Sequence, residues 1–176
     1  MSITLPRELL AKYRNPVFVE TGTYKGDGVA LAREVGFEEI HSIEIDPERY
    51  EQCRLRFKEA QGVFLYLGDS AKVFPQILAR LTRRATIWLD AHAFGAGDTK
   101  EYSGTRWPLS EELRALAESA LRKDHVLLID DRHDFGLFGM TEDGVLETIR
   151  RINGAYQISF EDSKDRPKNI LVAATL

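Results

Sequence analysis

The sequence has a single cysteine, Cys53, and no long apolar run. One cysteine cannot form an internal disulfide, and it has no second thiolate with which to build a zinc site. No apolar segment reaches the roughly 20 residues that a membrane-spanning helix needs. Residues 1–15 lack the extended apolar core of a signal peptide. These absences argue against a disulfide-rich secreted protein and a membrane protein, and we expect a cytoplasmic one.

The chain also has little excess charge, no internal repeat and no low-complexity tract. Its 24 Lys and Arg residues stand against 28 Asp and Glu residues, a formal net charge of −4 with neutral histidine. A mildly acidic chain does not predict a nucleic-acid partner, and we interpret the basic segment 79–84 as a solvated helix end. The ordinary apolar and charged fractions, 43% and 30%, predict one compact domain over residues 1–176.

Short apolar runs alternate with helical patterns along most of the chain. Strands are expected at residues 16–20, 40–45, 62–68, 85–90, 125–131, 155–161 and 169–176. Helices are expected at residues 5–14, 27–35, 46–60, 69–81, 108–121 and 141–152. This alternation predicts a doubly wound, mostly parallel α/β sheet with helices on both faces. The last two strands are joined by a polar loop without a helix, so we expect that pair to be antiparallel.

Three glycines follow the first expected strand within seven positions: Gly22, Gly26 and Gly28. Tyr24 stands where a dinucleotide-binding G-x-G-x-x-G would need its second glycine, which disfavours a nicotinamide-dependent reductase. Ligands of parallel sheets bind outside the carboxyl ends of the strands, where glycines let a ligand approach the backbone. A glycine-rich turn that only reverses the chain is the alternative.

Acidic residues follow the next two expected strands. Glu44 ends the second strand about twenty residues beyond Gly22, where a carboxylate can accept hydrogen bonds from ribose hydroxyls. A solvated glutamate at a strand end is the alternative. Asp69 and Ser70 follow the third strand and can cap the next helix. Asp69 can also face an adenine amino group.

Three aspartates, Asp90, Asp130 and Asp131, follow the fourth and fifth expected strands. If these strands are neighbours, the carboxylates meet on one rim, where two charges about 4 Å apart repel by about 4 kcal/mol at an effective dielectric constant near 20. Converging aspartates therefore either take up protons or bind a cation. Mg²⁺ suits such oxygen ligands, with Ca²⁺ or Mn²⁺ as substitutes. The alternative is that Asp90 only accepts a ligand hydrogen bond and Asp131 caps a turn.

Two histidines flank this rim, since His92 follows Asp90 by two residues and His133 follows Asp131 by two. Either could remove a hydroxyl proton, because the pKa of histidine lies near neutral pH. His92 has the better position, at the start of the long segment 91–107. The alternative is that each histidine only hydrogen-bonds its own loop.

The segment 91–107 is longer than an ordinary connection, and we interpret it as a substrate lid. Its candidate walls are Phe94, Tyr102, Arg106 and Trp107. A second apolar loop, residues 135–140, could line a pocket on the same rim or form a partner surface. The alternative for the first segment is a disordered insertion.

The segments VETGTYKGDG, IHSIEID and GDS, in this order, resemble the first three cofactor-binding motifs of the class I S-adenosylmethionine-dependent methyltransferases. The resemblance covers almost the entire chain and implies that family's seven-stranded sheet with an antiparallel last strand. It implies that Glu20 and the glycines lie by the methionine part of the cofactor, Glu44 by the ribose and Asp69 by the adenine. The implied cofactor-binding residues are Glu20, Gly22, Thr23, Gly26, Glu44, Ile45, Asp69, Ser70 and Asp90.

One aspartate after the fourth strand and an acidic pair after the fifth resemble the metal-dependent O-methyltransferases of the catechol and macrocin types. This resemblance implies that Asp90, Asp130 and Asp131 bind Mg²⁺, which would hold a hydroxyl group of a small-molecule acceptor and lower its pKa. The catalytic candidates are His92, Asp90 and His133.

The chain is short for this type, so the acceptor would be enclosed by the two loops or by a second subunit of a homodimer. Two rival functions stay open. One is a metal-independent methyltransferase of the same fold, acting on oxygen or nitrogen with His92 or Asp90 at the acceptor. The other is a non-catalytic module that holds the nucleoside or a partner protein.

Overall fold

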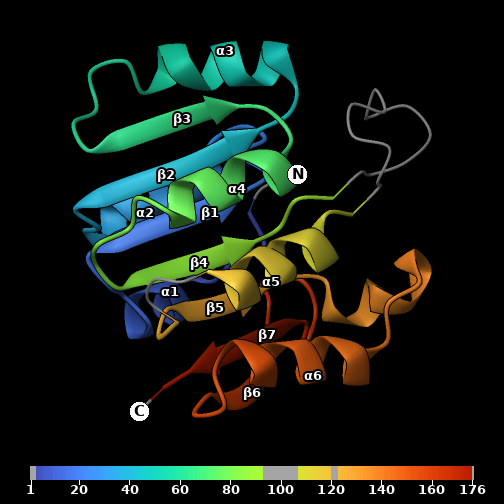
Figure 1. The fold of residues 1–176 in the computed structure, drawn as a ribbon. Helices are drawn as coiled ribbons and strands as arrows, with labels where there is room; N and C mark the ends of the chain where they lie inside the picture. The colour runs from blue at the N-terminus through green and yellow to red at the C-terminus, as the bar shows by residue number, and fades with distance from the viewer. Residues whose placement is uncertain (1–2, 93–106, 120–122, 176) are drawn as a thin grey trace.

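The computed structural model describes residues 3–92, 107–119 and 123–175 (Figure 1). Its seven strands form one sheet in the order β3-β2-β1-β4-β5-β7-β6. The strands are β1 (Val17–Thr21), β2 (Glu39–Glu44), β3 (Val63–Leu67), β4 (Ala85–Leu89), β5 (Val126–Ile129), β6 (Gln157–Glu161) and β7 (Ile170–Ala174). Strands β1 to β5 pair in parallel, and β7 is antiparallel to both β5 and β6. The predicted mostly parallel sheet with an antiparallel last strand is confirmed.

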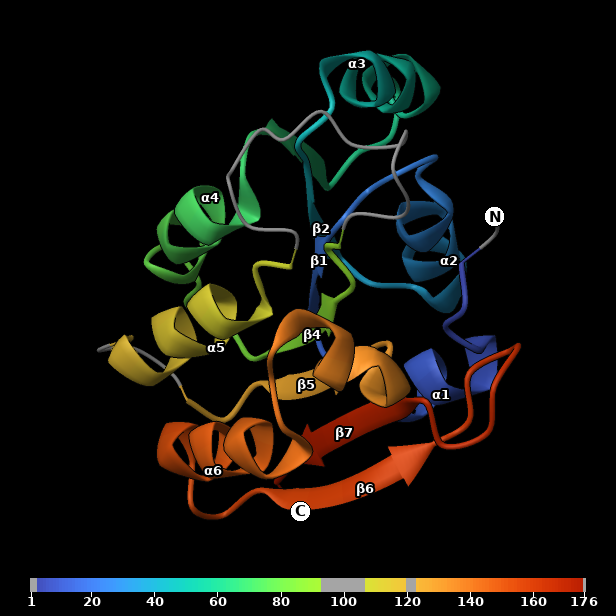
Figure 2. The same cartoon turned by 90° about the vertical axis from the view of Figure 1, so that its right-hand side faces the viewer.

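Helices cover both faces of the sheet, as the view in Figure 2 makes clear. They are α1 (Arg7–Lys12), α2 (Asp27–Val35), α3 (Pro47–Arg56), α4 (Ser70–Leu78), α5 (Leu109–Glu118), the 3-10 helix η1 (Arg132–Phe138) and α6 (Glu142–Ile152). Helices α4, α5 and α6 lie side by side on one face, and α1, α2 and α3 lie on the other. The sheet is therefore doubly wound, as the alternating pattern predicted.

Helix α3 begins where its capping residue predicts. Asp46 accepts hydrogen bonds from the backbone N–H groups of Glu48 and Arg49, and Pro47 takes the first position of α3. Helix α3 was expected to continue to residue 60, but it ends at Arg56. The next residue, Phe57, leaves the helical conformation and is buried, so packing rather than helix propensity ends the helix. The segment 135–140, expected as a loop, is mostly part of η1.

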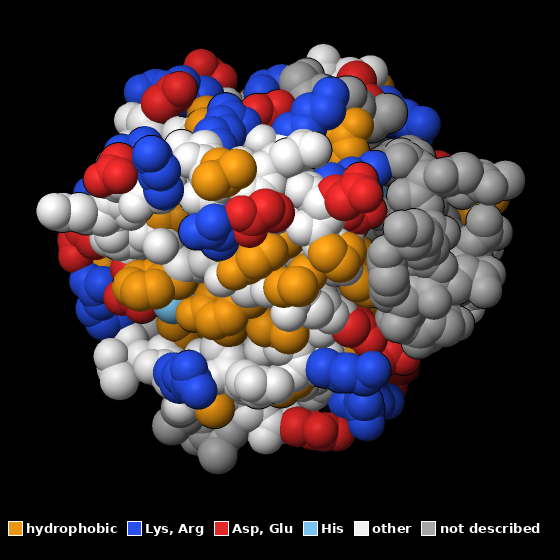
Figure 3. All heavy atoms as spheres, turned by 90° about the horizontal axis from the view of Figure 1, so that it is seen from above, with side chains coloured by type: hydrophobic (Ala, Val, Ile, Leu, Met, Phe, Trp, Pro, Cys, Tyr) orange, Lys and Arg blue, Asp and Glu red, His pale blue; other side chains and the backbone are white. Residues whose placement is uncertain are grey.

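The core consists of two apolar layers, one on each face of the sheet. All five residues of β1 and of β4 are buried, because these central strands are covered on both faces. Edge strand β3 is less covered, and Figure 3 shows apolar side chains gathered on the side where β3 and α3 lie. Phe64 and Leu67 of β3 and Leu55 of α3 are exposed. Across the described residues, no helix combines the length and apolar character needed to cross a membrane.

Candidate active site

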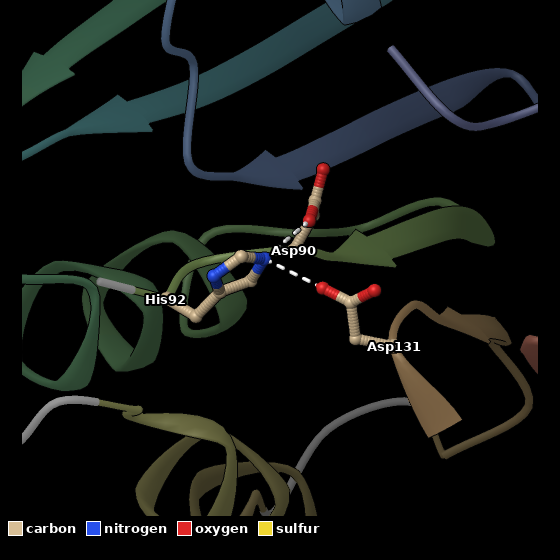
Figure 4. A group of neighbouring side chains, drawn as sticks. All are labelled: Asp90, His92 and Asp131. Carbon is tan, nitrogen blue, oxygen red and sulfur yellow. Dashed lines mark ion pairs between the residues drawn. The ribbon is translucent and has the colours of Figure 1, made fainter. Parts of the chain in front are cut away.

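The carboxyl ends of β4 and β5 bring Asp90, His92 and Asp131 together (Figure 4). Nε2 of His92 lies 2.7 Å from Oδ2 of Asp131 and 3.5 Å from Oδ1 of Asp90. One ligand atom from each of the three residues lies within 4.8 Å of the others. The prediction that the fourth and fifth strands are neighbours is confirmed, since Leu89 of β4 pairs with Ile129 of β5.

The two carboxylates control the charge of His92. Burial alone would lower the pKa of His92, but the hydrogen bonds and charges of Asp131 and Asp90 outweigh it and raise the pKa to about 9. Burial would raise the pKa of Asp131, yet His92 and Asn169 hold it below its ordinary value. Burial raises the pKa of Asp90, with the charge of Asp131 adding to the effect. At neutral pH the imidazole is therefore a cation bound between two acids.

The two consecutive aspartates face different partners. Asp131 has a left-handed backbone, φ 51° and ψ 37°, an uncommon conformation for a residue other than glycine. Its carboxylate points at His92, whereas the carboxylate of Asp130 accepts hydrogen bonds from the hydroxyl of Thr4 and the amide of Asn169. Burial, with the charges of Asp90 and Asp131, raises the pKa of Asp130 to about 8. Asp130 thus does not join the group in which His92 takes part.

The other residues expected around this rim are dispersed. His133 is exposed, and its Nε2 lies 2.9 Å from the carbonyl oxygen of Pro167, so it does not meet Asp90 or Asp131. Trp107 is buried, with its ring 6.0 Å from that of His92 and 5.6 Å from that of Phe135. It packs edge-on against the His92 ring, two residues before the start of α5. The expected lid walls Phe94, Tyr102 and Arg106 lie outside the described residues.

A buried polar chain follows the end of β1. Ser42 donates a hydrogen bond to Oε2 of Glu20 at 2.6 Å, and its oxygen lies 2.6 Å from the hydroxyl of Thr23. Glu20 is 1% exposed, and burial raises its pKa to about 8 despite the bond from Ser42. Ser42 of β2 therefore connects the carboxyl group that was expected beside the methionine part of the cofactor to the loop of Thr23. Ser42 was missed from the sequence because a serine inside a strand carries no signal of its own.

The glycines of this loop are required by the protein's own atoms. Gly22 has φ +87°, and a Cβ there would lie 2.9 Å from the carbonyl oxygen of Asp90. Gly26 has φ +80°, and a Cβ there would lie 2.6 Å from the ring of Phe57. Both positions thus need glycine for backbone conformation and for space. The contact at Gly22 brings the first loop against the backbone of Asp90, which joins the expected cofactor loop to the Asp90–His92–Asp131 group.

Glu44 lies at the carboxyl end of β2 with both oxygens engaged. Oε2 accepts the backbone N–H of Tyr24 at 2.7 Å, and Oε1 accepts that of Asp46 at 2.9 Å. Burial raises the pKa of Glu44, and these two amides oppose the effect. Each oxygen keeps a second lone pair that can accept from a ribose hydroxyl. Ile45 follows half-buried.

Asp69 and Ser70 stand at the start of α4. The carboxylate of Asp69 accepts the N–H of Ala71 at 3.0 Å and caps the helix, as the sequence predicted. Ser70 is the first residue of the helix and is buried. The expected sites for the methionine part, the ribose and the adenine thus follow β1, β2 and β3 along one edge of the sheet.

Sequence reasoning missed Glu112 on α5. This glutamate is 1% exposed, and burial raises its pKa to about 7. The buried apolar residues Leu109, Leu113 and Leu116 have helical spacing, and position 112 falls on the same stripe. A charged residue at an apolar position of an amphipathic helix was the available signal.

Comparisons with known proteins agree with this geometry at the level of the fold. No family model matches the sequence, and no curated protein matches it. An O-methyltransferase from Bacillus cereus, solved with S-adenosylhomocysteine, matches with a TM-score of 0.58 at 15% identity, over 97% of this chain and 78% of that chain. The O-methyltransferase TomG from Streptomyces achromogenes, involved in tomaymycin synthesis and solved with S-adenosylmethionine, matches with a TM-score of 0.56 at 17% identity, over 96% and 77%.

A third similar structure is a methyltransferase from Podospora anserina bound to S-adenosylhomocysteine. It has a TM-score of 0.63 at 12% identity, over 97% of this chain and 76% of that chain. Together with the strand order and the antiparallel β7, these matches show that the chain has the class I S-adenosylmethionine-dependent methyltransferase fold.

Proposed function

We propose that this protein transfers the methyl group of S-adenosylmethionine to a hydroxyl oxygen of a small-molecule acceptor, with the help of a divalent metal ion. The observation that carries the proposal is the group of Asp90, His92 and Asp131 at the carboxyl edge of a sheet of the class I methyltransferase type. Gly22 packs against the backbone of Asp90, so a cofactor lying on the first loop would present its methyl group beside this acidic rim.

The proposal that S-adenosylmethionine binds depends on the residues that follow β1, β2 and β3. Glu44 offers free lone pairs to ribose hydroxyls, and the loop from Gly22 to Gly26 is the candidate site of the methionine part. Asp69 and Ser70 offer the start of α4 to the adenine. Three similar structures carry S-adenosylmethionine or its demethylated product in the corresponding fold, which favours the same ligand here.

The proposal of a metal ion depends on the ligand atoms that the acidic rim offers. Asp90 and Asp131 offer hard carboxylate oxygens that suit Mg²⁺ or, as a substitute, Mn²⁺, and His92 lies beside them without serving as a ligand. Asp130, which bonds to Thr4 and Asn169, stays a predicted ligand. Bound to these residues, the ion would lower the pKa of the acceptor hydroxyl and hold its oxygen.

His92 is the base in this proposal. Its Nε2 faces both carboxylates and holds a proton while they are charged. With their charge neutralised, the pKa of His92 would fall, Nε2 would release its own proton to solvent, and it could then accept the proton of the acceptor hydroxyl. The resulting oxygen then forms a bond to the methyl carbon as the bond between that carbon and the sulfonium sulfur breaks. Trp107 covers one side of the imidazole and limits the access of water to it.

The proposal is tested by incubating the protein with labelled S-adenosylmethionine, Mg²⁺ and a panel of catechols, flavonoids and sugars. We expect label in at least one hydroxyl compound and formation of S-adenosylhomocysteine, both lost on addition of a chelator and recovered with excess Mg²⁺. If calorimetry detected no binding of S-adenosylhomocysteine, the protein could not use this cofactor and the proposal would be wrong. The homodimer, the cytoplasmic location and the absence of a nucleic-acid partner stay predictions.

A second candidate is a metal-independent methyltransferase on the same fold. The observation that favours it is the 2.7 Å contact between His92 and Asp131, in which an imidazole already compensates the acidic charge. In this case Asp131 orients His92, and the neutral form of the imidazole, a minority at neutral pH, accepts the proton of the acceptor without help from a metal ion. Chelation distinguishes the two candidates, because it would leave this activity unchanged.

A further inference from the structure

Glu112 is a buried acid without a satisfied partner. It lies in the first turns of α5 and is 1% exposed, and neither of its carboxylate oxygens has a hydrogen-bond partner among the described residues. Burial raises its pKa to about 7, and the negative charges of Asp69 and Glu111 add to the effect. An unsatisfied buried polar group destabilises a fold, so its presence needs an explanation.

Two hydroxyl groups at the ends of the expected cofactor site act on Glu112. The hydroxyls of Ser70 and Thr21 lie close enough to oppose the effect of burial on the pKa of Glu112, but neither is aligned for a full hydrogen bond. Thr21 ends β1 and directly precedes Gly22, and Ser70 follows Asp69 at the start of α4. Glu112 is thus coupled to a residue at each of the first and third expected cofactor loops.

Thr21 also connects Glu112 to the acidic rim. Its Oγ1 accepts the backbone N–H of Asp90 at 3.3 Å, which leaves the hydroxyl hydrogen free to turn toward another acceptor. Glu112 is the carboxylate beside it. The hydroxyl of Thr21 therefore interacts both with Glu112 and with the backbone of Asp90. Trp107, which packs against the ring of His92, lies two residues before the start of α5, the helix that contains Glu112.

We propose that Glu112 is a positioning residue of the methyltransferase site, whose carboxylate accepts the hydroxyl hydrogens of Thr21 and Ser70 once the nucleoside is bound between their loops. The inference deepens the proposed function and rests on it. In the ligand-free protein these hydroxyls are poorly aligned with the carboxylate, which lowers stability. Binding of the nucleoside draws the start of α4 and the end of β1 into a single arrangement, in which these hydrogen bonds form and add to affinity.

This role predicts that one substitution keeps or raises the Tm of the ligand-free protein while it lowers the affinity for the nucleoside. Glu112→Leu removes the unsatisfied carboxylate, so the ligand-free protein should melt at the same temperature as the wild type or a few degrees higher. The same variant should bind S-adenosylhomocysteine at least tenfold more weakly, because the hydroxyls lose their acceptor. A residue that only supports the fold would give the reverse pattern, with a lower Tm and an unchanged Kd.

The experiment compares wild type, Glu112→Leu and Glu112→Gln by thermal unfolding without ligand and by calorimetric titration with S-adenosylhomocysteine. Glu118→Leu and Glu118→Gln are the matched controls, since Glu118 is exposed at the other end of α5. Glu112→Gln keeps the shape of the side chain and one acceptor oxygen, so it tests the affinity if the leucine variant does not fold. We expect it to weaken binding severalfold without lowering Tm.

A kinetic measurement separates positioning from loss of folded protein. The KM for S-adenosylmethionine should rise in both Glu112 variants, while the KM for the acceptor stays within twofold of the wild type. Equal affinity of variants and wild type for S-adenosylhomocysteine would overturn the inference and leave the proposed function intact. A wild type that binds no S-adenosylhomocysteine would overturn both.

Discussion

A Cβ atom at position 28 would lie 1.6 Å from Oε1 of Glu20. Gly28 is in the first turn of α2, where alanine would ordinarily stabilise the helix by about 1 kcal/mol relative to glycine. Here the methyl group would collide with a buried carboxyl group that Ser42 holds in position. The glycine therefore lets α2 pack directly over the end of β1.

Gly28→Ala should lower the free energy of unfolding by about 1–3 kcal/mol, because overpacking outweighs the gain in helix propensity. Urea unfolding measures the change. Gly154→Ala is the control, since nothing lies within 4 Å of a Cβ at that position. In the double variant with Glu20→Ala the clash is absent, so the two effects should not add. If the free-energy changes of Gly28→Ala and Glu20→Ala were additive, the clash with Glu20 would not be the cause of the destabilisation.

The buried carboxyl group of Glu20 makes stability depend on pH. Burial raises its pKa from 4.5 to about 8, so the folded protein keeps a proton that the unfolded chain releases. Its contribution is fully present below about pH 4.5 and is lost as the pH rises to about 8, with a slope of at most about 1.4 kcal/mol per pH unit. Glu20→Gln should flatten the fall in stability measured by urea unfolding between pH 5 and pH 8.

The control for this titration is Glu51→Gln, which changes a fully exposed glutamate paired with Arg54. Its pH profile should run parallel to that of the wild type. A residual slope is expected in Glu20→Gln, because the pKa values of Asp130 and Glu112 are also raised. Profiles of equal slope in Glu20→Gln and wild type would mean that Glu20 is ionised in the folded protein.

The sequence predicted the sheet well because its signals are local. Alternating apolar runs and helical patterns depend on neighbouring residues, and so do the caps at Asp46 and Asp69. The predicted end of α3 was wrong, because the true end depends on a contact with a residue far away in the sequence. Phe57 leaves the helix and packs where Gly26 has no side chain, and such a contact has no signature in the sequence around residue 57.

The candidate site was predictable to the level of strand ends. Asp90 and Asp131 meet because parallel neighbouring strands end at one edge, which the element order implies. That Asp130 bonds to Thr4, a residue 126 positions away, could not be read from the sequence. Nor could the left-handed backbone of Asp131, which determines how its carboxylate meets His92.

Asp131→Asn tests the acidic rim directly. We expect a loss of methyl transfer of tenfold or more and a weaker response to Mg²⁺, because the variant removes a charged oxygen that faces His92. Titration of activity with Mg²⁺ measures both effects. Asp134→Asn is the control on the same segment, since the Asp134 side chain forms an ion pair with the exposed Arg166. A variant as active as the control would remove Asp131 from the mechanism.

Glu44→Gln tests the ribose site without changing the shape of the side chain. The amide offers one acceptor oxygen to the N–H groups of Tyr24 and Asp46, where the carboxylate offers two charged ones. Affinity for S-adenosylhomocysteine should fall about tenfold, which corresponds to about 1.4 kcal/mol, close to the lower end of the range for a hydrogen bond to a charged group. Calorimetric titration measures it, with Glu48→Gln on the exposed first turn of α3 as the control. Adenosine should lose as much affinity as S-adenosylhomocysteine, because both carry the ribose. Loss confined to S-adenosylhomocysteine would instead assign Glu44 to the methionine part, and the proposed order of cofactor parts along the sheet edge would be wrong.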